Sequence, residues 1–127
     1  MESLGKILAV MSDLFFSVKI IDVAKKLGLA VEVVSDRNVA IAKAKALPPL
    51  IIIDLNCAGA DPLGLIRAIK ADPSTARIPI FAFVSHVQTQ LRQQALDAGC
   101  DTVVARAVFS GKLPELLATA AQSRAAG

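Results

Sequence analysis

Short apolar runs rich in β-branched residues recur along the chain, and the segments between them carry apolar residues at helical spacing. Short runs of this kind are typical of strands buried in a sheet, whereas the longer periodic segments indicate helices. The pattern predicts strands at Ile7 to Val10, Ala30 to Val34, Leu50 to Ile53, Ile80 to Val84 and Thr102 to Val104.

The ends of three predicted helices are marked by residues that suit a helix terminus. Asp61 is placed to cap the third helix, with Pro62 at its first position, where the missing N–H of proline does no harm. Gly28 and Gly99 are expected to end the first and fourth helices, because glycine readily takes the left-handed conformation that follows a helix.

Strand and helix alternate through the whole chain, which favours parallel strands joined by right-handed crossover connections. The third strand is apolar throughout, as expected for a sheet that helices cover on both faces. No low-complexity linker interrupts the alternation. We therefore expect one α/β domain over residues 1–127, built as a three-layer, doubly wound sheet.

Composition and charge narrow the range of functions. The chain is 54% apolar and has a formal charge of +3, but its basic residues are scattered and it has neither Trp nor Tyr for base stacking. Nucleic acid is therefore not an expected partner. Cys57 and Cys100 form no metal-binding or redox motif and are too few for a disulfide scaffold, which predicts a reducing, cytoplasmic location.

The apolar segments do not suit a signal peptide or a membrane span. The run from Ile7 to Met11 is stopped by Asp13, and the run from Leu47 to Ile53 contains two prolines. We expect no membrane partner.

Open parallel sheets place their ligand sites at the carboxyl ends of the strands, near the point where the strand order reverses. Asp54 stands out there, since it directly follows three isoleucines and would bring a carboxylate out of a buried strand. A capping or loop aspartate is the alternative interpretation. The candidate site residues are Met11, Ser12, Asp13, Asp54, Asn56, Val84, Ser85 and Arg106.

A family resemblance rests on the segments Lys6 to Val10, Pro49 to Asn56, Gly59 to Pro62, Ala71 to Ser74 with Ile78 to Ile80, and Ala98 to Asp101. In order and spacing they resemble the receiver domains of bacterial two-component response regulators, over nearly the whole chain. The resemblance implies a flavodoxin-like fold with five helices and five parallel strands in the order 2-1-3-4-5.

The chain departs from the receiver pattern at most of the residues that carry its chemistry. Typical receivers have an acidic pair after the first strand, a phosphorylated aspartate after the third, a Ser or Thr after the fourth and Lys-Pro after the fifth. Asp54 matches the phosphorylated aspartate. The other positions hold Met11 with Ser12, Val84, and Arg106 with Ala107.

These departures weaken the chemistry of phosphoryl transfer. The reaction depends on Mg²⁺, a hard cation that takes oxygen ligands, and the thioether of Met11 is too soft to serve. Ser12 offers only a neutral oxygen, while Asp13 comes one residue late and would have to turn back from the first helix. We expect no cofactor, with Mg²⁺ bound weakly or not at all. Val84 cannot donate a hydrogen bond to a phosphoryl group.

Arg106 keeps the positive charge of the usual lysine, but its planar guanidinium suits a direct pair with a carboxylate. We therefore predict an ion pair between Arg106 and Asp54, with a solvated surface arginine as the alternative. His86 has no second metal ligand near it in the sequence, and we assign it no role.

Three hypotheses for the function follow. The first is a stand-alone pseudo-receiver, not an enzyme, that signals or scaffolds without phosphorylation by binding a histidine kinase or another signalling protein. The second is an active response regulator phosphorylated on Asp54, with Asp13 as a displaced metal ligand. A flavin or nucleotide enzyme ranks third, because the turn from Met11 to Phe15 lacks the glycine and small hydroxyl residues that would cradle a phosphate.

The first helix is expected to present an interaction surface. It has two apolar stripes on nearly opposite sides, and the resemblance turns Phe16, Ile20, Val23 and Leu27 toward the sheet. The stripe left outward consists of Leu14, Val18 and Ile21. We interpret it as a contact for a partner protein or a second copy of the chain; cover by the fifth helix or the chain end is the alternative.

Overall fold

The computed structural model describes residues 5–85 and 88–126, so His86 lies outside the described residues. Within them, five parallel strands form one sheet in the order β2-β1-β3-β4-β5, which confirms the expected topology. The strands are β1 (Ile7–Val10), β2 (Val31–Val34), β3 (Ile51–Asp54), β4 (Ile80–Val84) and β5 (Thr102–Ala105). The helices are α1 (Leu14–Lys26), α2 (Arg37–Ala44), the short 3-10 turn η1 (Ala58–Ala60), α3 (Pro62–Ala71), α4 (Thr89–Ala98) and α5 (Arg106–Ala126).

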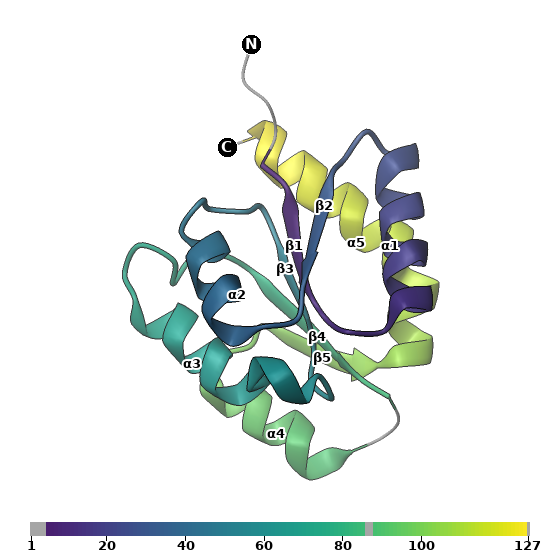
Figure 1. Ribbon diagram of the computed structural model, residues 1–127. Coiled ribbons are helices and arrows are strands. Elements are labelled where there is room, and N and C mark those ends of the chain that lie inside the picture. Colours follow the sequence, from purple (N-terminus) through teal and green to yellow (C-terminus); the bar gives the residue numbers. More distant parts are fainter. Residues whose placement is uncertain (1–4, 86–87, 127) are drawn as a thin grey trace.

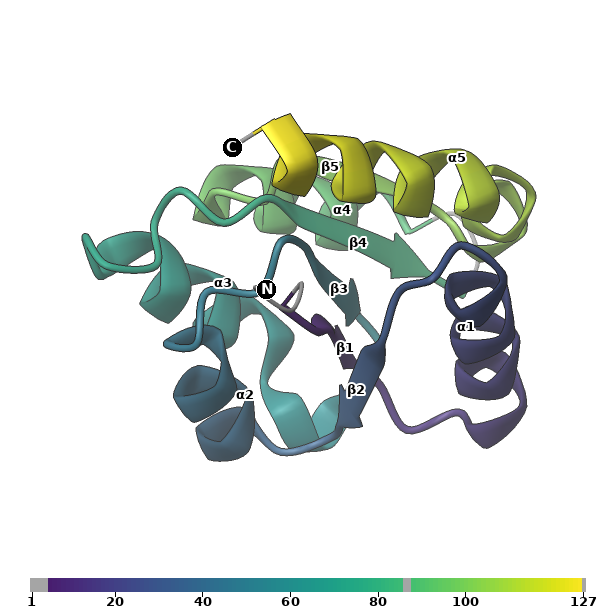
Figure 2. The same ribbon diagram turned by 90° about the horizontal axis from the view of Figure 1, so that it is seen from above.

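The helices cover the sheet on both faces. Helices α1 and α5 lie side by side on one face, and α2, α3 and α4 lie on the other (Figures 1 and 2). Alternate strand residues point to opposite faces, so each face has its own apolar cluster. In β3, for example, Ile51 and Ile53 belong to the cluster under α2, α3 and α4, whereas Ile52 belongs to the cluster under α1 and α5.

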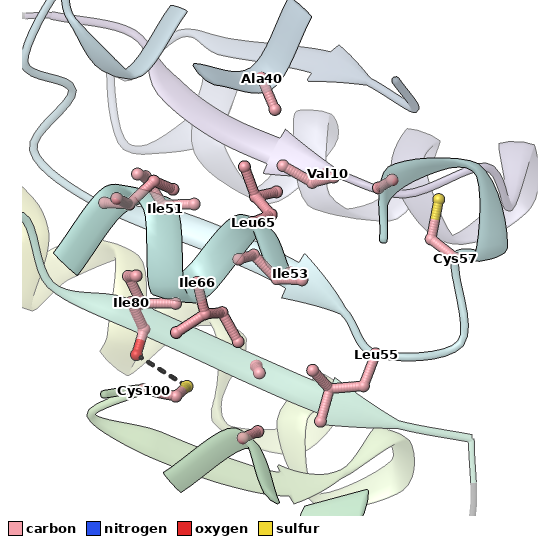
Figure 3. Packing of buried hydrophobic residues seen from close by; sticks show 14 of the residues in the cluster. Val10, Ala40, Ile51, Ile53, Leu55, Cys57, Leu65, Ile66, Ile80 and Cys100 are labelled. Carbon is pink, nitrogen blue, oxygen red and sulfur yellow. Dashed lines mark hydrogen bonds between the residues drawn. The ribbon is translucent and has the colours of Figure 1, made fainter. Parts of the chain in front are cut away.

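The cluster under α2, α3 and α4 is aliphatic (Figure 3). Leu65 and Ile66 of α3 are fully buried against the sheet. Both cysteines, Cys57 and Cys100, are buried here and unbonded to each other. The thiol of Cys100 lies 3.4 Å from the carbonyl oxygen of Ile80, and burial raises the pKa of this thiol to about 11. Cys100 is therefore a packing residue whose thiol stays protonated at neutral pH.

The cluster under α1 and α5 is built around phenylalanine rings. Phe83 of β4 stacks on Phe109 of α5 with 4.9 Å between ring centroids, and Phe16 of α1 meets the edge of Phe83 at 5.1 Å. Phe109, Leu113 and Leu117 of α5 are completely buried. Aromatic pairs of this geometry fix α1 and α5 against the carboxyl-terminal half of the sheet.

Helix boundaries follow the terminal residues that the sequence marked. Gly28 and Gly99 have φ values of 75° and 113° and follow α1 and α4, as predicted. Asp61 occupies the N-cap position of α3 before Pro62, also as predicted, although its side chain makes no capping hydrogen bond. Instead it covers Gly64, where a Cβ would lie only 2.2 Å from an Asp61 carboxylate oxygen. A larger residue at position 64 would therefore require the exposed Asp61 side chain to turn away.

The strand ends differ from the prediction by one residue, which matters at the carboxyl edge. Strand β3 includes Asp54 as its last residue, and β5 continues to Ala105, so that α5 begins directly at Arg106. Both site residues are therefore held by regular structure and not by loops. None of the helices in the described part of the chain is long and apolar enough to cross a membrane.

Candidate functional site

Asp54 lies at the carboxyl edge of the sheet, on the strand between β1 and β4. Its side chain is half-buried, and one carboxylate oxygen accepts a hydrogen bond of 2.9 Å from the backbone N–H of Asn56. Burial raises the pKa of Asp54 above its ordinary value; the Asn56 hydrogen bond and the positive charge of Arg106 oppose this effect without cancelling it. The carboxylate is thus placed where the sequence predicted, at the end of the buried strand, and it is partly desolvated.

The positive charge of Arg106 acts on Asp54, but the guanidinium does not pair with that carboxylate. The guanidinium donates a hydrogen bond to a carboxylate oxygen of Asp13. The predicted ion pair between Arg106 and Asp54 is therefore wrong. Arg106 influences Asp54 only through its charge, which lowers the pKa of that carboxyl group.

The first turn of α1 explains why Arg106 binds Asp13. The carbon at the centre of the guanidinium lies 4.6 Å from the ring centroid of Phe16, a cation–π contact that holds the group against α1. Asp13 is the N-cap of the same helix, with its other oxygen accepting a 3.0 Å hydrogen bond from the Phe16 N–H. Asp13 and Asp54 each have one oxygen bonded to a backbone N–H, so this bond does not distinguish them. The Phe16 ring does, because it holds the guanidinium at the start of α1, beside Asp13.

The capping bond and the ion pair act on the same carboxyl group. The backbone N–H of Phe16 is the largest cause, and the hydrogen bond from Arg106 the next, of a pKa for Asp13 that lies below its ordinary value. Asp13 therefore stays ionised at neutral pH while both of its oxygens serve structural contacts.

The residues that replace the receiver pattern at the ends of β1 and β4 point in different directions. Met11 is 1% exposed and packs into the cluster under α1 and α5, whereas Ser12 is exposed. Val84 is also buried, in the cluster on the opposite face of the sheet. Among the candidate site residues Ser12, Asp13, Asp54, Val84 and Arg106, Asp13 and Arg106 are in contact and Asp54 lies within range of their charges.

This donor set does not fit Mg²⁺. In the described residues, no three His, Cys, Asp or Glu side chains gather so that they could hold a metal ion. Among the residues that the structure describes, Asp13 is a carboxylate whose charge acts on Asp54, and it is already shared between a guanidinium and a helix cap. A hard cation would have to displace both contacts, with the Met11 thioether turned into the core.

Sequence reasoning placed Asn56 among the candidate site residues but did not predict the role of its side chain. The side-chain oxygen of Asn56 accepts a 2.9 Å hydrogen bond from the backbone N–H of Ser85, and its amide nitrogen donates a 3.0 Å bond to the side chain of Gln88. The side chain thus connects the end of β3 to the end of β4 and the start of α4. Nothing in the linear pattern signals these bonds, because the partners are about thirty residues away.

The outward stripe of α1 is exposed as predicted. Leu14, Val18 and Ile21 are 77%, 64% and 42% exposed, and neither α5 nor the chain end covers them in the described residues. Phe15, which the sequence did not single out, extends the surface and is 93% exposed. We call these four residues the α1 patch. Large apolar side chains grouped in this way on one helix are typical of contact surfaces.

The inward stripe of α1 is confirmed except at its end. Ile20 is fully buried, and Phe16 and Val23 pack partly buried against the same cluster. The prediction for Leu27 is wrong, since this residue is 41% exposed. The helix ends at Lys26, and Leu27 is its C-cap, so the side chain of Leu27 does not continue the buried face of the helix. Leu29 is the buried leucine of this segment.

Comparison with known proteins places this architecture among response-regulator structures. No protein-family model and no curated protein matches the sequence. A response regulator from Hahella chejuensis superposes with a TM-score of 0.82 at 19% identity, over 93% of this chain and 95% of that one. The phosphorylated cyanobacterial phytochrome response regulator RcpA gives a TM-score of 0.75 at 22% identity, with 91% and 89% covered.

A third similar structure holds a metal. The receiver domain of the sensor histidine kinase PA1611 from Pseudomonas aeruginosa, which has a magnesium ion coordinated in its active-site cleft, matches with a TM-score of 0.78 at 24% identity, over 92% of this chain and 97% of that one. Identities at this level establish the fold alone. With its strand order, its flanking helices and an aspartate at the end of the central strand, this chain has the fold of a response-regulator receiver domain.

Proposed function

We propose that this chain is a pseudo-receiver: a signalling or scaffolding module that binds a partner protein and does not depend on phosphorylation, nor act as an enzyme. The observation that carries the proposal is the ion pair between Asp13 and Arg106. Phosphoryl transfer to Asp54 needs a free cation site and a mobile positive charge beside it. In this chain the two charged side chains there are bound to each other. The cytoplasmic location expected from the cysteines is part of the proposal.

The α1 patch is the surface by which the module would act. Its apolar residues lie at helical spacing on one element, a form that suits packing against a helix of a partner. A histidine kinase or another signalling protein with an apolar helix face is the expected partner, and a second copy of the chain is the alternative.

An active phosphoacceptor is the second candidate function. Its support is the half-buried carboxyl group of Asp54 at the end of β3. The Asn56 N–H binds one of its oxygens, and the other oxygen takes no part in that bond. On this alternative, Mg²⁺ would be bound weakly, and Arg106 would have to leave Asp13 to reach a phosphoryl group.

Incubation with acetyl phosphate and Mg²⁺, followed by intact-mass spectrometry, separates the two functions. We expect no mass increase of one phosphoryl group in the wild-type chain. An increase that disappears in Asp54→Ala would establish the active phosphoacceptor and reject the pseudo-receiver. The Asp13→Asn variant, which removes the charge that holds Arg106, is the informative comparison: phosphorylation in this variant alone would show that the ion pair blocks the reaction.

A further inference from the structure

The side chain of Asn56 joins three elements that are separate in the sequence. Asp54 and Asn56 share the turn after β3, where a carboxylate oxygen of Asp54 accepts the Asn56 N–H at 2.9 Å. From the same residue, the side-chain amide reaches the Ser85 N–H at the end of β4 and the Gln88 side chain at the start of α4. A continuous line of hydrogen bonds therefore runs from Asp54 to α4.

Gln88 connects these hydrogen bonds to the first turn of α4. Gln88 is the N-cap residue of α4, and its backbone carbonyl accepts the first helical hydrogen bond, from the Arg92 N–H at 2.9 Å. Its side chain makes no capping bond within the helix; its oxygen accepts a hydrogen bond from the Asn56 amide. The first turn of α4 is thus tied to the β3 turn through the side chain of its N-cap residue.

We propose that Asn56 is a latch that sets the position of the start of α4 and transmits changes at Asp54 to that helix. The buried residue at the end of β4, Val84, has no hydroxyl with which to connect the site to the rest of the molecule. The latch supplies such a connection through Asn56, Ser85 and Gln88, and it operates whether or not Asp54 is ever phosphorylated.

Residue-resolved amide hydrogen exchange, measured by NMR on the full chain, tests the latch. The reporters are the amides of Ser85 and Arg92, which report the β4 end and the first turn of α4. Loss of one net hydrogen bond corresponds to roughly three- to tenfold faster exchange. Asn56→Ala should therefore accelerate both reporters by about that factor, while the amides of β2 keep their wild-type rates.

Further variants test the two side-chain hydrogen bonds of Asn56 separately. Asn56→Asp keeps an acceptor for Ser85 but loses the donor to Gln88, so only the Arg92 amide should exchange faster. Gln88→Ala should have the same effect, and Asn56→Ala combined with Gln88→Ala should be no faster at Arg92 than either single change. Gln93→Ala, which removes a 2.9 Å bond to Asp97 within α4, is the matched control and should leave both reporters unchanged.

The transmission from Asp54 is tested with Asp54→Ala. This change should accelerate the Ser85 and Arg92 amides in the wild-type background and have no effect on them once Asn56 is alanine. If Asn56→Ala leaves both reporters within twofold of wild type, or accelerates amides throughout the sheet equally, Asn56 is not a latch. An Asp54→Ala effect that persists without Asn56 would likewise overturn the proposed route.

Discussion

Arg106 has two carboxylates within range of its charge, and only that of Asp13 accepts its hydrogen bond. Each carboxylate has one oxygen bonded to a backbone N–H, so the choice depends on the Phe16 ring, which lies under the guanidinium at the start of α1. A lysine at position 106 would keep the charge but lose the planar contact with the ring and the directed bond to Asp13.

Replacing Arg106 tests how much its contacts contribute to stability and to the pKa values of the two aspartates. Arg106→Ala should lower the free energy of unfolding by about 0.5–2 kcal/mol, because the contact with the Phe16 ring is lost. It should also raise the pKa of both Asp13 and Asp54, since the positive charge lowers each of them. Urea denaturation and NMR titration of the carboxyl carbons measure the two effects. Arg106→Lys keeps the positive charge but loses the planar contact with the ring, so it should restore the wild-type pKa values more fully than the wild-type stability. Equal recovery of both would argue against the ring contact.

Asp54 should make stability depend on pH in the opposite sense to most carboxylates. Its raised pKa means that the folded state favours the neutral form, so its charge destabilises the fold at a pH above the folded pKa, and this cost vanishes below the ordinary value near 4. Asp54→Asn should therefore be more stable than the wild type at pH 7, with the difference disappearing toward pH 3.

Comparing the two proteins isolates Asp54 from other titrating groups. Asp13 and Asp72 have lowered pKa values and lose their stabilising contribution as the pH falls, but they do so in both proteins. The measurement is thermal unfolding of each protein from pH 3 to pH 7. A stability difference that does not vary with pH, or an asparagine variant that is less stable at pH 7, would contradict the raised pKa.

At the scale of the element, α1 combines a buried face and an exposed apolar face within thirteen residues. The buried face is short and contains Ile20 and Ala24, together with Ser17, whose hydroxyl donates a 2.9 Å bond to the Leu14 carbonyl. The exposed face carries the α1 patch. The same helix thus contributes to the core and offers a surface for contact.

Substitutions on the two faces of α1 should differ in their effect on the free energy of unfolding. Val18→Lys combined with Ile21→Lys should change the free energy of unfolding by no more than about 0.5 kcal/mol per site, because both side chains are already exposed. Ile20→Ala, from the buried face, should cost about 2–5 kcal/mol. If the α1 patch is a contact surface, the lysine variant should also lose self-association or partner binding, measured by sedimentation and pull-down.

A large loss of stability in the lysine variant would show that the patch is covered in solution. Unchanged association would show that the interface lies elsewhere on the molecule. Arg67→Ala, on the exposed face of α3, is a control that should affect neither property.

At the scale of the whole molecule, packing limits how far a receiver site can be rebuilt. The side chain of Met11 belongs to the core under α1 and α5, so a carboxylate there is buried among apolar groups. Ser12, its neighbour, is exposed at the edge of the sheet. The two positions of the missing acidic pair are therefore not equivalent.

Titration with Mg²⁺ makes this difference measurable. The wild type should bind Mg²⁺ with millimolar affinity or not at all, and Ser12→Asp should strengthen binding at little cost to the fold. Met11→Asp should destabilise the protein by about 3–5 kcal/mol, because it places a charge in the core without a partner. Calorimetry and urea denaturation give the two quantities; wild-type affinity comparable to that of active receivers would contradict the expectation for Mg²⁺.

The sequence by itself determined the elements, their order and the position of Asp54. Periodicity is a local property, so the β-branched runs and the terminal residues Gly28, Asp61 and Gly99 could be interpreted without knowledge of distant contacts. Helical spacing also showed two opposite apolar stripes on the first helix, of which a helix on a sheet can bury only one. The receiver resemblance then assigned Leu14, Val18 and Ile21 to the outward side.

Only the tertiary structure decided which side chains meet at the site. The pair of Arg106 with Asp13 depends on α5 lying beside α1, and the bonds of Asn56 depend on the distance between the ends of β3 and β4. Side chains with several donors or acceptors have alternative partners at similar cost, and the choice among them is made by burial and by neighbouring groups that the linear sequence leaves unspecified.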